Sequence, residues 1–240
     1  MLLIVIGGIG FLTWDDFCTN KWNLKRYRLQ SKIILVTTTV LILLPALFFF
    51  LSDFAGFSMG KRILASLFQS VTLRTAGFNT ADLGAMNDSS KALMMLIGGS
   101  PGSTAGGMKT TTIAVLILNA FATFGREPET EVFGRRFDNT VVKNAATIAI
   151  LYFFLFFTGG IAISQIEHVA LSDCLFETAS AVGTAGLTLG ITTELGLVSH
   201  LILVVLMYLG RVGGLTLIYA AISVKIQSGA KRPLDKITVG

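Results

Sequence analysis

The segment Gly98–Lys109 reads GGSPGSTAGGMK and interrupts a run of otherwise apolar sequence. Residues 92–97 (ALMMLI) lead into it, and residues 113–118 (IAVLIL) lead out of it. Neither flank reaches the length of about 20 apolar residues that a helix needs to cross a bilayer. Unpaired backbone is costly in lipid, so an unwound segment at membrane depth is stable only inside protein or along a water-filled path. The segment therefore predicts a spanning helix that is broken on a transport route, with a plain loop between two short helices as the alternative.

Composition places the whole chain in a lipid bilayer. Of the 240 residues, 52% are hydrophobic and only 14% are charged. These values are typical of a polytopic membrane protein, here with about five or six spans and short loops. Residues 1–12, MLLIVIGGIGFL, are apolar but too few to cross a bilayer. We therefore expect that the chain is truncated at its N-terminus, or that Met1 is an internal methionine.

Basic residues indicate the orientation. Most of the 19 lysines and arginines fall in three polar stretches that we assign to one face of the membrane. They are Lys21, Lys25, Arg26, Arg28, Lys32, Arg126, Arg135, Arg136, Lys143, Lys225, Lys231, Arg232 and Lys236. The positive-inside rule makes this face cytoplasmic, which predicts a cytoplasmic C-terminus and a multi-pass protein of the cell inner or plasma membrane. The basic balance points to topology and lipid headgroups rather than to nucleic acid, because no basic face is interleaved with aromatic residues.

The chain contains a repeat. Each unit predicts a long span, a half-membrane helix, a T-A-G hairpin and a returning span. The half-membrane helices, 63–71 and 170–181, are too short to cross and therefore predict re-entrant segments. Phe68-Gln69-Ser70 matches Phe176-Glu177-Thr178, and after a slip of one residue Thr75-Ala76-Gly77-Phe78 matches Thr184-Ala185-Gly186-Leu187. Both units run in the same direction, which favours an axis along the membrane normal.

The repeat predicts an all-α polytopic membrane protein of tandem span–pore-helix–span units around a cation pore. The expected boundaries are the end of an earlier helix (1–12), a cytoplasmic linker (13–32), a first unit with a broken inner helix (33–124), a second linker (125–140), a second unit (141–225) and a cytoplasmic tail (226–240). The long spans within the units are expected at 33–51 and 141–165.

The hairpins carry the predicted chemistry. A half-membrane helix directs its partially negative C-terminus at the membrane interior. A small-residue hairpin after it lets successive carbonyls face one line and replace the water around a cation. We predict that Gly77 and Gly186 line a selectivity filter, because a side chain there would crowd the pore axis. Neighbouring backbone oxygens would come from Thr75, Ala76, Gly183, Thr184 and Ala185. Two tight turns at the outer surface are the alternative.

Three basic residues lie near these features. Arg211 sits within an apolar segment, where an arginine is costly and functional by default. Carbonyls freed in the broken helix are plausible acceptors for its guanidinium, and snorkelling to an interface is the alternative. Arg74 adjoins the first hairpin and is interpreted as pointing into a scaffold behind it or as a solvated residue at the mouth. For Lys109, structural and gating roles are both open.

At this point the residues resemble a known family. VTLRTAGFNT (71–80), IGGSPGSTAGGMKTTT (97–112), SAVGTAGLTLGIT (180–192) and YLGRVGGLT (208–216) look like the Trk/Ktr/HKT potassium-transporter superfamily. The similarity is closest to the membrane subunit of bacterial Ktr systems, and the ending RPLDKITVG resembles the C-terminus of that subunit. The resemblance implies four span–pore-helix–span repeats around one potassium pore, of which this chain resembles the end of repeat two and then repeats three and four, about half of the fold.

The resemblance also implies roles for residues and partners. Gly77 and Gly186 become the signature filter glycines that hold K⁺ through nearby backbone carbonyls, and Arg211 faces a gating loop as its latch. The gating-loop residues are Gly98, Gly99, Ser100, Pro101, Gly102, Ser103, Thr104, Ala105, Gly106, Gly107 and Lys109. Homodimers and a cytoplasmic ring of nucleotide-binding regulatory subunits are implied, with potassium as the transported ion and no cofactor. Sodium coupling stays open.

Other functions fit the sequence less well. Residues 102–110 nearly match a phosphate-binding loop, but Met108 separates the last glycine from Lys109 and no strand precedes it. An intramembrane serine protease would need a histidine base at membrane depth, and His168 and His200 lie toward the outer face. We therefore predict no enzyme. The remaining alternative is a sodium-coupled secondary transporter of a small solute with a discontinuous helix, which needs a roomy substrate site instead of a narrow filter.

Overall fold

The computed structural model describes residues 1–95, 103, 106–127 and 129–213. The helices in chain order are α1 (Leu2–Gly8), α2 (Phe11–Asn20), η1 (Leu24–Arg26), α3 (Leu29–Ser52), α4 (Met59–Thr72), α5 (Asp88–Met94), α6 (Thr110–Phe124), α7 (Asn139–Glu167), α8 (Leu171–Gly183), η2 (Ile191–Glu194) and α9 (Leu197–Val212). A two-residue antiparallel hairpin, β1 (Glu131–Val132) and β2 (Arg135–Arg136), joins α6 to α7. The predicted all-α architecture is confirmed, with this hairpin as its small exception.

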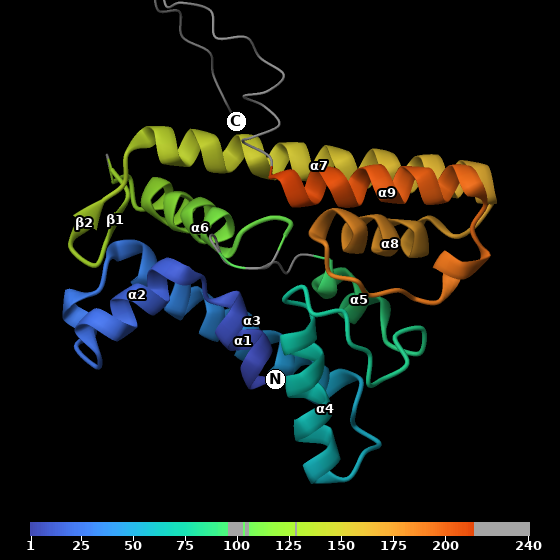
Figure 1. Cartoon of the computed structure of the whole chain (residues 1–240), viewed down its shortest axis with the longest axis horizontal. Coiled ribbons are helices and arrows are strands. Elements are labelled where there is room, and N and C mark those ends of the chain that lie inside the picture. The colour runs from blue at the N-terminus through green and yellow to red at the C-terminus, as the bar shows by residue number, and fades with distance from the viewer. Residues whose placement is uncertain (96–102, 104–105, 128, 214–240) are drawn as a thin grey trace, which may run out of the picture.

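The repeat is visible in the arrangement of the helices. The α7, α8 and α9 helices lie together along one side of the molecule, and α3 and α4 lie on the other (Figure 1). The long helices α3 and α7, of 24 and 29 residues, are long and apolar enough to cross a membrane. The short helices α4 and α8 have 14 and 13 residues. At 1.5 Å per residue they are roughly 20 Å long, less than the roughly 30 Å of a bilayer core.

The N-terminal boundary differs from the expectation. The predicted limit between a helix end (1–12) and a linker (13–32) falls inside α2, because the helix break lies earlier. Gly10 has a φ of 95°, and α1 and α2 meet there at an angle of 96°. The carboxylate of Asp16 in α2 then accepts hydrogen bonds from Arg28 N (3.0 Å) and Ser31 Oγ (2.6 Å). Arg28 directly precedes α3 and Ser31 lies in its first turn, so these bonds let α2 anchor the start of that helix.

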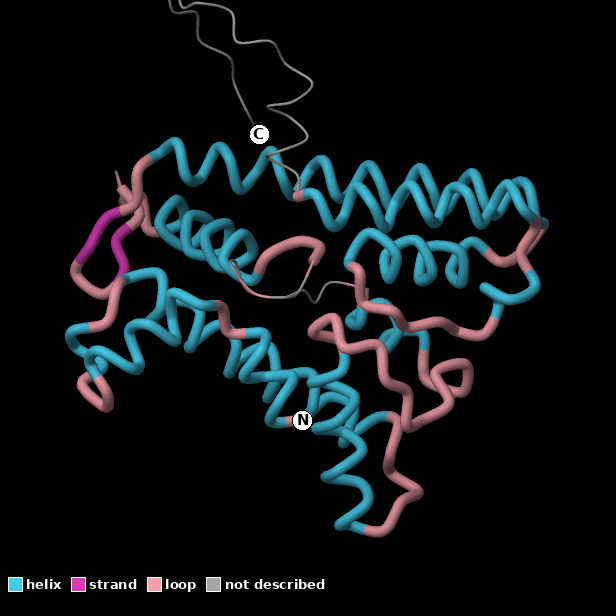
Figure 2. Tube along the Cα trace, viewed as in Figure 1, coloured by secondary structure: helices cyan, strands magenta, loops and turns pink. Residues whose placement is uncertain are grey.

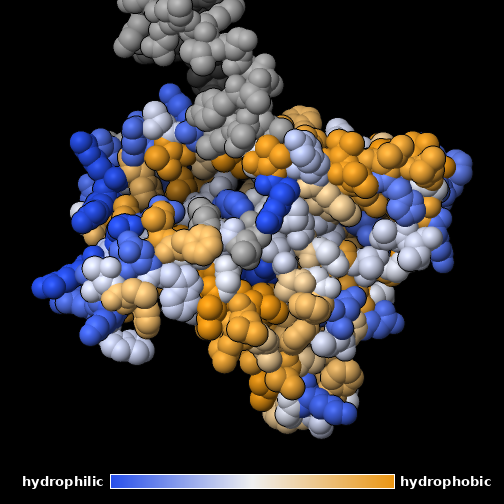
Figure 3. Space-filling model, viewed as in Figure 1, coloured by the Kyte–Doolittle hydropathy of each residue, from blue (hydrophilic) through white to orange (hydrophobic). Residues whose placement is uncertain are grey.

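Apolar side chains cover the outward faces of the long helices. The exposed residues on α3 include Val36, Val40, Leu43, Leu44 and Leu47, and those on α9 include Leu197, Leu201, Val204 and Val205. Figure 3 shows apolar surface over the α7 and α9 side and hydrophilic surface at the end that carries α2 and the β1–β2 hairpin. Such apolar bands would be unfavourable in water and suit contact with lipid.

The two predicted cytoplasmic linkers meet at that hydrophilic end. Lys32 Nζ lies 6.0 Å from the centroid of the Phe133 ring. Arg136 forms an ion pair with Glu129 at 2.8 Å, and this carboxylate raises the pKa of the Arg136 guanidinium. The basic stretches around residues 21–32 and 126–143 therefore share one end of the molecule, as a common membrane face requires.

Buried hydroxyls attach each short helix to its long helix in the same way. Ser70 Oγ in α4 donates to the carbonyl of Ile42 in α3 at 2.7 Å. Thr178 Oγ1 in α8 donates to the carbonyl of Phe156 in α7 at 2.9 Å. Ser70 and Thr178 are the matched positions of the sequence repeat, so the repeat extends to individual hydrogen bonds.

An acidic residue closes each unit at the opposite end. Asp53, just after α3, accepts from Asn87 N (2.9 Å) and Ser90 Oγ (2.6 Å) at the start of α5. Glu167, the last residue of α7, accepts from Gly196 N (2.8 Å) and from Ser199 Oγ at the start of α9. A carboxylate at a helix N-terminus satisfies unpaired amides and complements the helix dipole. We call these two contacts the acid clasps.

The first acid clasp gives a stability prediction. Ser90 is fully buried and Ser89 beside it is exposed. We expect Ser90→Ala to lower the free energy of unfolding of the detergent-solubilised chain by about 1.5–3 kcal/mol, because a hydrogen bond to a charged group is lost. Ser89→Ala is the control and should stay within about 0.5 kcal/mol of the parent. Thermal or denaturant unfolding measures both, and equal losses in the two variants would contradict the role of the clasp.

Candidate functional site

The two predicted filter hairpins have the same backbone conformation. In the first, Thr75 and Gly77 have φ values of 63° and 71°. In the second, Thr184 and Gly186 have φ values of 51° and 78°. Left-handed backbone is unfavourable for threonine, so its recurrence at both matched positions indicates a conformation that the surrounding structure imposes. Glycine adopts it at little cost.

A hydroxyl near the end of each short helix imposes this conformation. Thr72 Oγ1 donates to the carbonyl of Phe78 at 2.7 Å and accepts from the amide of the same residue at 3.0 Å. Ser180 Oγ donates to the carbonyl of Leu187 at 2.6 Å and accepts from its amide at 3.0 Å. We call each pair of bonds a hydroxyl clamp. Each clamp holds the residue after the signature glycine against the end of the short helix. The backbone between the clamping hydroxyl and that residue must therefore turn sharply.

The two hairpins face each other. Figure 2 shows the loops that follow α4 and α8 meeting between these helices. A Cβ atom placed on Gly77 would lie 3.0 Å from the carbonyl oxygen of Ala185 and 3.2 Å from that of Gly186. A Cβ atom on Gly186 would lie 3.3 Å from the Cα atom of Gly77. Backbone oxygens of the second hairpin therefore point at the first, and a side chain at either glycine would enter the space between them.

Backbone oxygens are the hydrogen-bond and ion acceptors that the two hairpins present to each other. No group of three His, Cys, Asp or Glu side chains gathers as a metal site within the described part of the chain. A potassium-sized ion can exchange its water for a set of backbone carbonyls. The arrangement is therefore chemically suited to a weakly held, dehydrated monovalent cation.

Arg74 lies behind the first hairpin, as one of the two sequence interpretations proposed. Its side chain is 2% exposed, and its Nη2 atom lies 3.4 Å from the carbonyl oxygen of Gly8 at the C-terminal end of α1. The partial negative charge of a helix C-terminus favours a cation. The solvated position at the mouth is therefore wrong, and Arg74 connects the first hairpin to α1.

The end of the predicted gating loop packs against the underside of the second hairpin. A Cβ atom on Gly106 would clash with the side chain of Thr184, and one on Gly107 would lie 2.7 Å from the carbonyl oxygen of Gly183. Gly107 N donates to the carbonyl of Gly210 in α9 at 3.2 Å. Gly210 in turn allows α9 to approach the backbone of Val182. Backbone-to-backbone contact thus requires glycine at positions 107 and 210, and the contact with the Thr184 side chain requires it at position 106.

The other predicted gating residues are only partly visible. Gly98, Gly99, Ser100, Pro101, Gly102, Thr104 and Ala105 lie outside the described residues. Lys109 is the residue before α6, and Arg211 lies in the last turn of α9. The two are close enough for their charges to interact. The turn of α9 that carries Arg211 also holds Gly210, so the helix end with the predicted latch contacts the loop.

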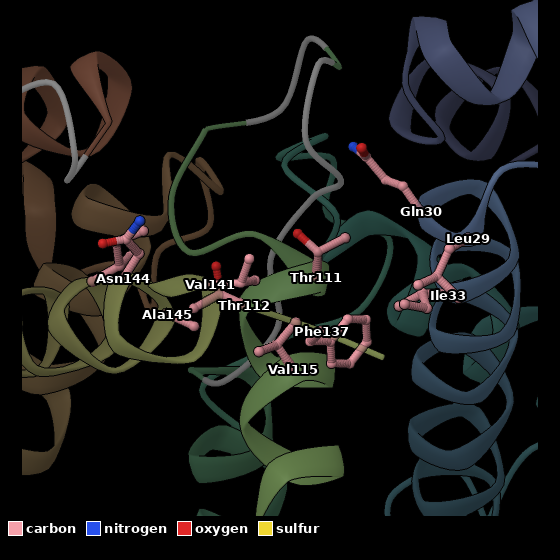
Figure 4. A pocket seen from close by; sticks show the side chains of 11 residues that line it. Leu29, Gln30, Ile33, Thr111, Thr112, Val115, Phe137, Val141, Asn144 and Ala145 are labelled. Carbon is pink, nitrogen blue, oxygen red and sulfur yellow. The ribbon is translucent and has the colours of Figure 1, made fainter. Parts of the chain in front are cut away.

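Two recesses show where a solute could and could not fit. A small space of about 20 Å³ lies beside the hairpins, lined by residues such as Leu73, Met94, Ser180 and Ala185. This volume is enough for about one water molecule. A recess of about 510 Å³ lies instead between α3, α6 and the start of α7, lined by residues such as Ile33, Thr112 and Asn144 (Figure 4). None of the predicted filter or gating residues lines this larger recess.

Sequence reasoning missed several hydrogen bonds that hold the hairpins and helices in place. They are the hydroxyl clamps of Thr72 and Ser180, the acid clasps of Asp53 and Glu167, and the bonds from the loop after the second hairpin to the buried carboxylate of Glu177. The signal for the clamps was present in the repeat. Extending the match of Ser70 with Thr178 by two residues aligns Thr72 with Ser180.

Fold and site together define a helical membrane protein built from span–short-helix–span units with paired, carbonyl-bearing hairpins. The family model of TrkH, a cation transport protein, matches residues 1–230. The chain therefore belongs to the TrkH family of cation transport proteins, as the sequence resemblance predicted.

Individual relatives agree. The chain is 33% identical to the potassium/sodium uptake protein NtpJ of Enterococcus hirae, over 99% of this chain and 56% of that protein. It is 32% identical to the Ktr system potassium uptake protein B of Bacillus subtilis, over 99% of this chain and 55% of that protein. The crystal structure of the potassium transporter TrkH from Vibrio parahaemolyticus shares the fold, with a TM-score of 0.74 at 22% identity over 92% of this chain and 50% of that one. The chain thus spans about half the length of these relatives.

The packing of the loop end gives a second prediction. Gly107 and Gly134 have similar φ values of 66° and 71°, but a Cβ atom on Gly134 would meet nothing within 4 Å. Gly134→Ala should cost only the backbone strain, about 1–2 kcal/mol. Gly107→Ala should cost about 1–3 kcal/mol more, because its Cβ atom overlaps the backbone of Gly183. Unfolding of the two variants measures the difference, and indistinguishable losses would contradict the tight contact.

Proposed function

We propose that the chain forms two neighbouring filter segments of a potassium uptake pathway. The observation that carries the proposal is the pair of matched hairpins whose signature glycines, Gly77 and Gly186, face each other. Potassium would be held by backbone carbonyls near these glycines, with neighbouring oxygens from Thr75, Ala76, Gly183, Thr184 and Ala185. The names of the relatives, which are potassium or potassium/sodium uptake proteins, support potassium as the transported ion.

We further propose that Gly98–Lys109 gates this pathway. Its end lies directly against the second hairpin, where a displaced loop would open space below the filter. Lys109 directly precedes α6 and Arg211 lies in the last turn of α9, so both lie near this contact. Arg211 would act as the latch by holding carbonyls of the loop, and its position beside Gly210 supports this role.

The family relationship supports a wider set of proposals. The protein would be a non-enzymatic component of the plasma membrane with its C-terminus in the cytoplasm, organised in the segments predicted from the sequence. It would form a homodimer and bind a cytoplasmic ring of nucleotide-binding regulatory subunits. The shared basic end of the two linkers supports the cytoplasmic assignment of that end. Coupling of potassium uptake to sodium stays open and should be measured, because one relative is named a potassium/sodium uptake protein.

A solute carrier is less well supported. Such a protein would need a substrate cavity of several hundred Å³ that the predicted filter or gating residues line. The recess of about 510 Å³ touches α6 but none of those residues, and the space beside the hairpins is about 20 Å³. The alternative is therefore not favoured.

Potassium uptake by a strain that lacks its own uptake systems tests the proposed function. The chain is expressed alone and also joined to the part of the Bacillus subtilis Ktr protein B that it does not cover. We expect growth at low potassium for at least one of these forms. Absence of potassium uptake from both forms, with protein present in the membrane, would contradict the proposal.

The filter assignment is tested in whichever form transports. Gly186→Ser should reduce the preference for potassium over sodium by about tenfold or more, equivalent to about 1.4 kcal/mol in relative ion binding. Its Cβ atom would lie 3.3 Å from Gly77, whereas a Cβ atom on Gly134, which has a similar φ of 71°, would meet nothing within 4 Å. Gly134→Ser is therefore the control and should keep the preference. Equal preferences in the two variants would argue against the filter.

The gate is tested by shortening the loop. Deleting residues within Gly102–Gly107 should raise potassium flux, because the contact below the second hairpin is lost. The amount of protein in the membrane is measured in parallel. Unchanged or reduced flux at normal protein levels would count against the gate.

A further inference from the structure

A carboxylate is buried behind the outer end of the second hairpin. Glu177 lies in the middle of α8, is 4% exposed, and accepts three hydrogen bonds from the loop that follows the hairpin. Its Oε1 atom accepts from Thr188 Oγ1 at 2.7 Å and from Leu189 N at 2.8 Å. Its Oε2 atom accepts from Thr192 Oγ1 at 2.6 Å. Burial of a charge is costly unless such donors compensate it, so this segment is folded around the carboxylate.

The contact continues the hydroxyl clamp. Ser180 and Glu177 are one helical turn apart on α8, and they hold consecutive residues of the segment 184–189. We call residues 75–80 and 184–189 the first and second filter strands, and the C-terminal end of each its outer end. Ser180 binds Leu187, directly after the signature glycine, and Glu177 binds the next two residues. The position of Gly186 and its carbonyl therefore depends on a strand that is fixed on its outer side by these two residues.

The first unit lacks this arrangement. Gln69 occupies the position that matches Glu177. Its Nε2 atom lies 3.8 Å from the sulfur of Met94, and its Oε1 atom has no hydrogen-bond partner among the described residues. The loop after the first hairpin holds itself locally, through a bond from Gly84 N to Asp82 Oδ1 at 3.0 Å. The two filter strands therefore have unequal support and unequal charge behind them.

We propose that Glu177 is a positioning residue that fixes the outer end of the second filter strand and thereby sets the discrimination between cations. This inference rests on the proposed function for its transport consequence, while the structural part concerns the chain alone. Discrimination between ions of different size needs carbonyls at defined positions, and a strand released at its outer end can adapt to a smaller ion. The carboxylate also favours a cation nearby through its charge.

Hydrogen exchange on the purified chain in detergent tests the structural part. In Glu177→Ala, the amide of Leu189 loses its acceptor, and peptides covering residues 187–192 should exchange about tenfold faster or more. Peptides covering residues 78–86 should not change. Glu194→Gln is the matched control, because it removes the same charge from an exposed residue of the same loop. Thr192→Val removes a single donor and should show a smaller acceleration of exchange. This variant replaces Glu177→Ala in the test if Glu177→Ala does not fold.

Cation uptake in the transporting form tests the consequence. Glu177→Ala should change the ratio of the KM values for potassium and sodium by about threefold or more, with the maximal rate per folded protein much less affected. A merely structural role would lower the amount of folded protein and leave the KM ratio unchanged. Glu194→Gln should keep both values.

The outcomes separate the two levels of inference. Unchanged exchange at residues 187–192 in the variants of Glu177 and Thr192 would overturn the positioning role. Faster exchange with an unchanged KM ratio would overturn the role in discrimination. If the parent chain transports no potassium in any form, the proposed function fails, and the exchange measurement still decides whether Glu177 holds the strand.

Discussion

A backbone that leaves a helix inside a membrane must find hydrogen-bond partners in the protein itself. The two hairpins meet this requirement through Thr72 and Ser180, whose hydroxyls each bind both the amide and the carbonyl of one residue beyond the turn. With these groups satisfied, the carbonyls of Ala185 and Gly186 are left to face Gly77 in the first hairpin. The same constraint explains the other recurring bonds, since Ser70 and Thr178 attach the short helices to the long ones. The site thus depends on a few hydroxyls that make short, non-spanning helices stable at membrane depth.

Much of the fold could be predicted because the lengths of the apolar segments distinguish the long helices from the short ones in both units of the repeat. Segments such as 33–51 and 141–165 are long enough to cross, and 63–71 and 170–181 are not, which is the pattern that the structure shows. The sequence placed Gly77 and Gly186 in matched hairpins after matched helices, and the structure brings the two glycines close together. Their role in a filter stays a prediction. The break between α1 and α2 was not predicted, because a single glycine with positive φ decides it and hydropathy does not register a change of direction within an apolar run.

The missing contacts share one physical reason. The bonds of Asp53 to Ser90 and of Glu167 to Gly196 join residues that are distant in sequence, and each depends on where a loop returns. Hydropathy treats these acids as loop residues, and only the folded chain shows that they close helix ends. Glu177 matches Gln69 in the sequence repeat. The consequence of their difference in charge is visible only in the folded chain, where the Glu177 carboxylate binds the loop around residues 188–192.

The slip of one residue in the repeat has a mechanical consequence. Three residues, 181–183, separate Ser180 from Thr184, whereas two, 73–74, separate Thr72 from Thr75. The added length includes Gly183, which contacts Gly107, and among the residues that the structure describes this contact is made by the second unit. The two units are therefore not equivalent, because the loop end packs against the hairpin of the second unit. If the loop closes the pathway, opening would depend on the contacts that it makes with the second unit and would not need an equal movement of both units.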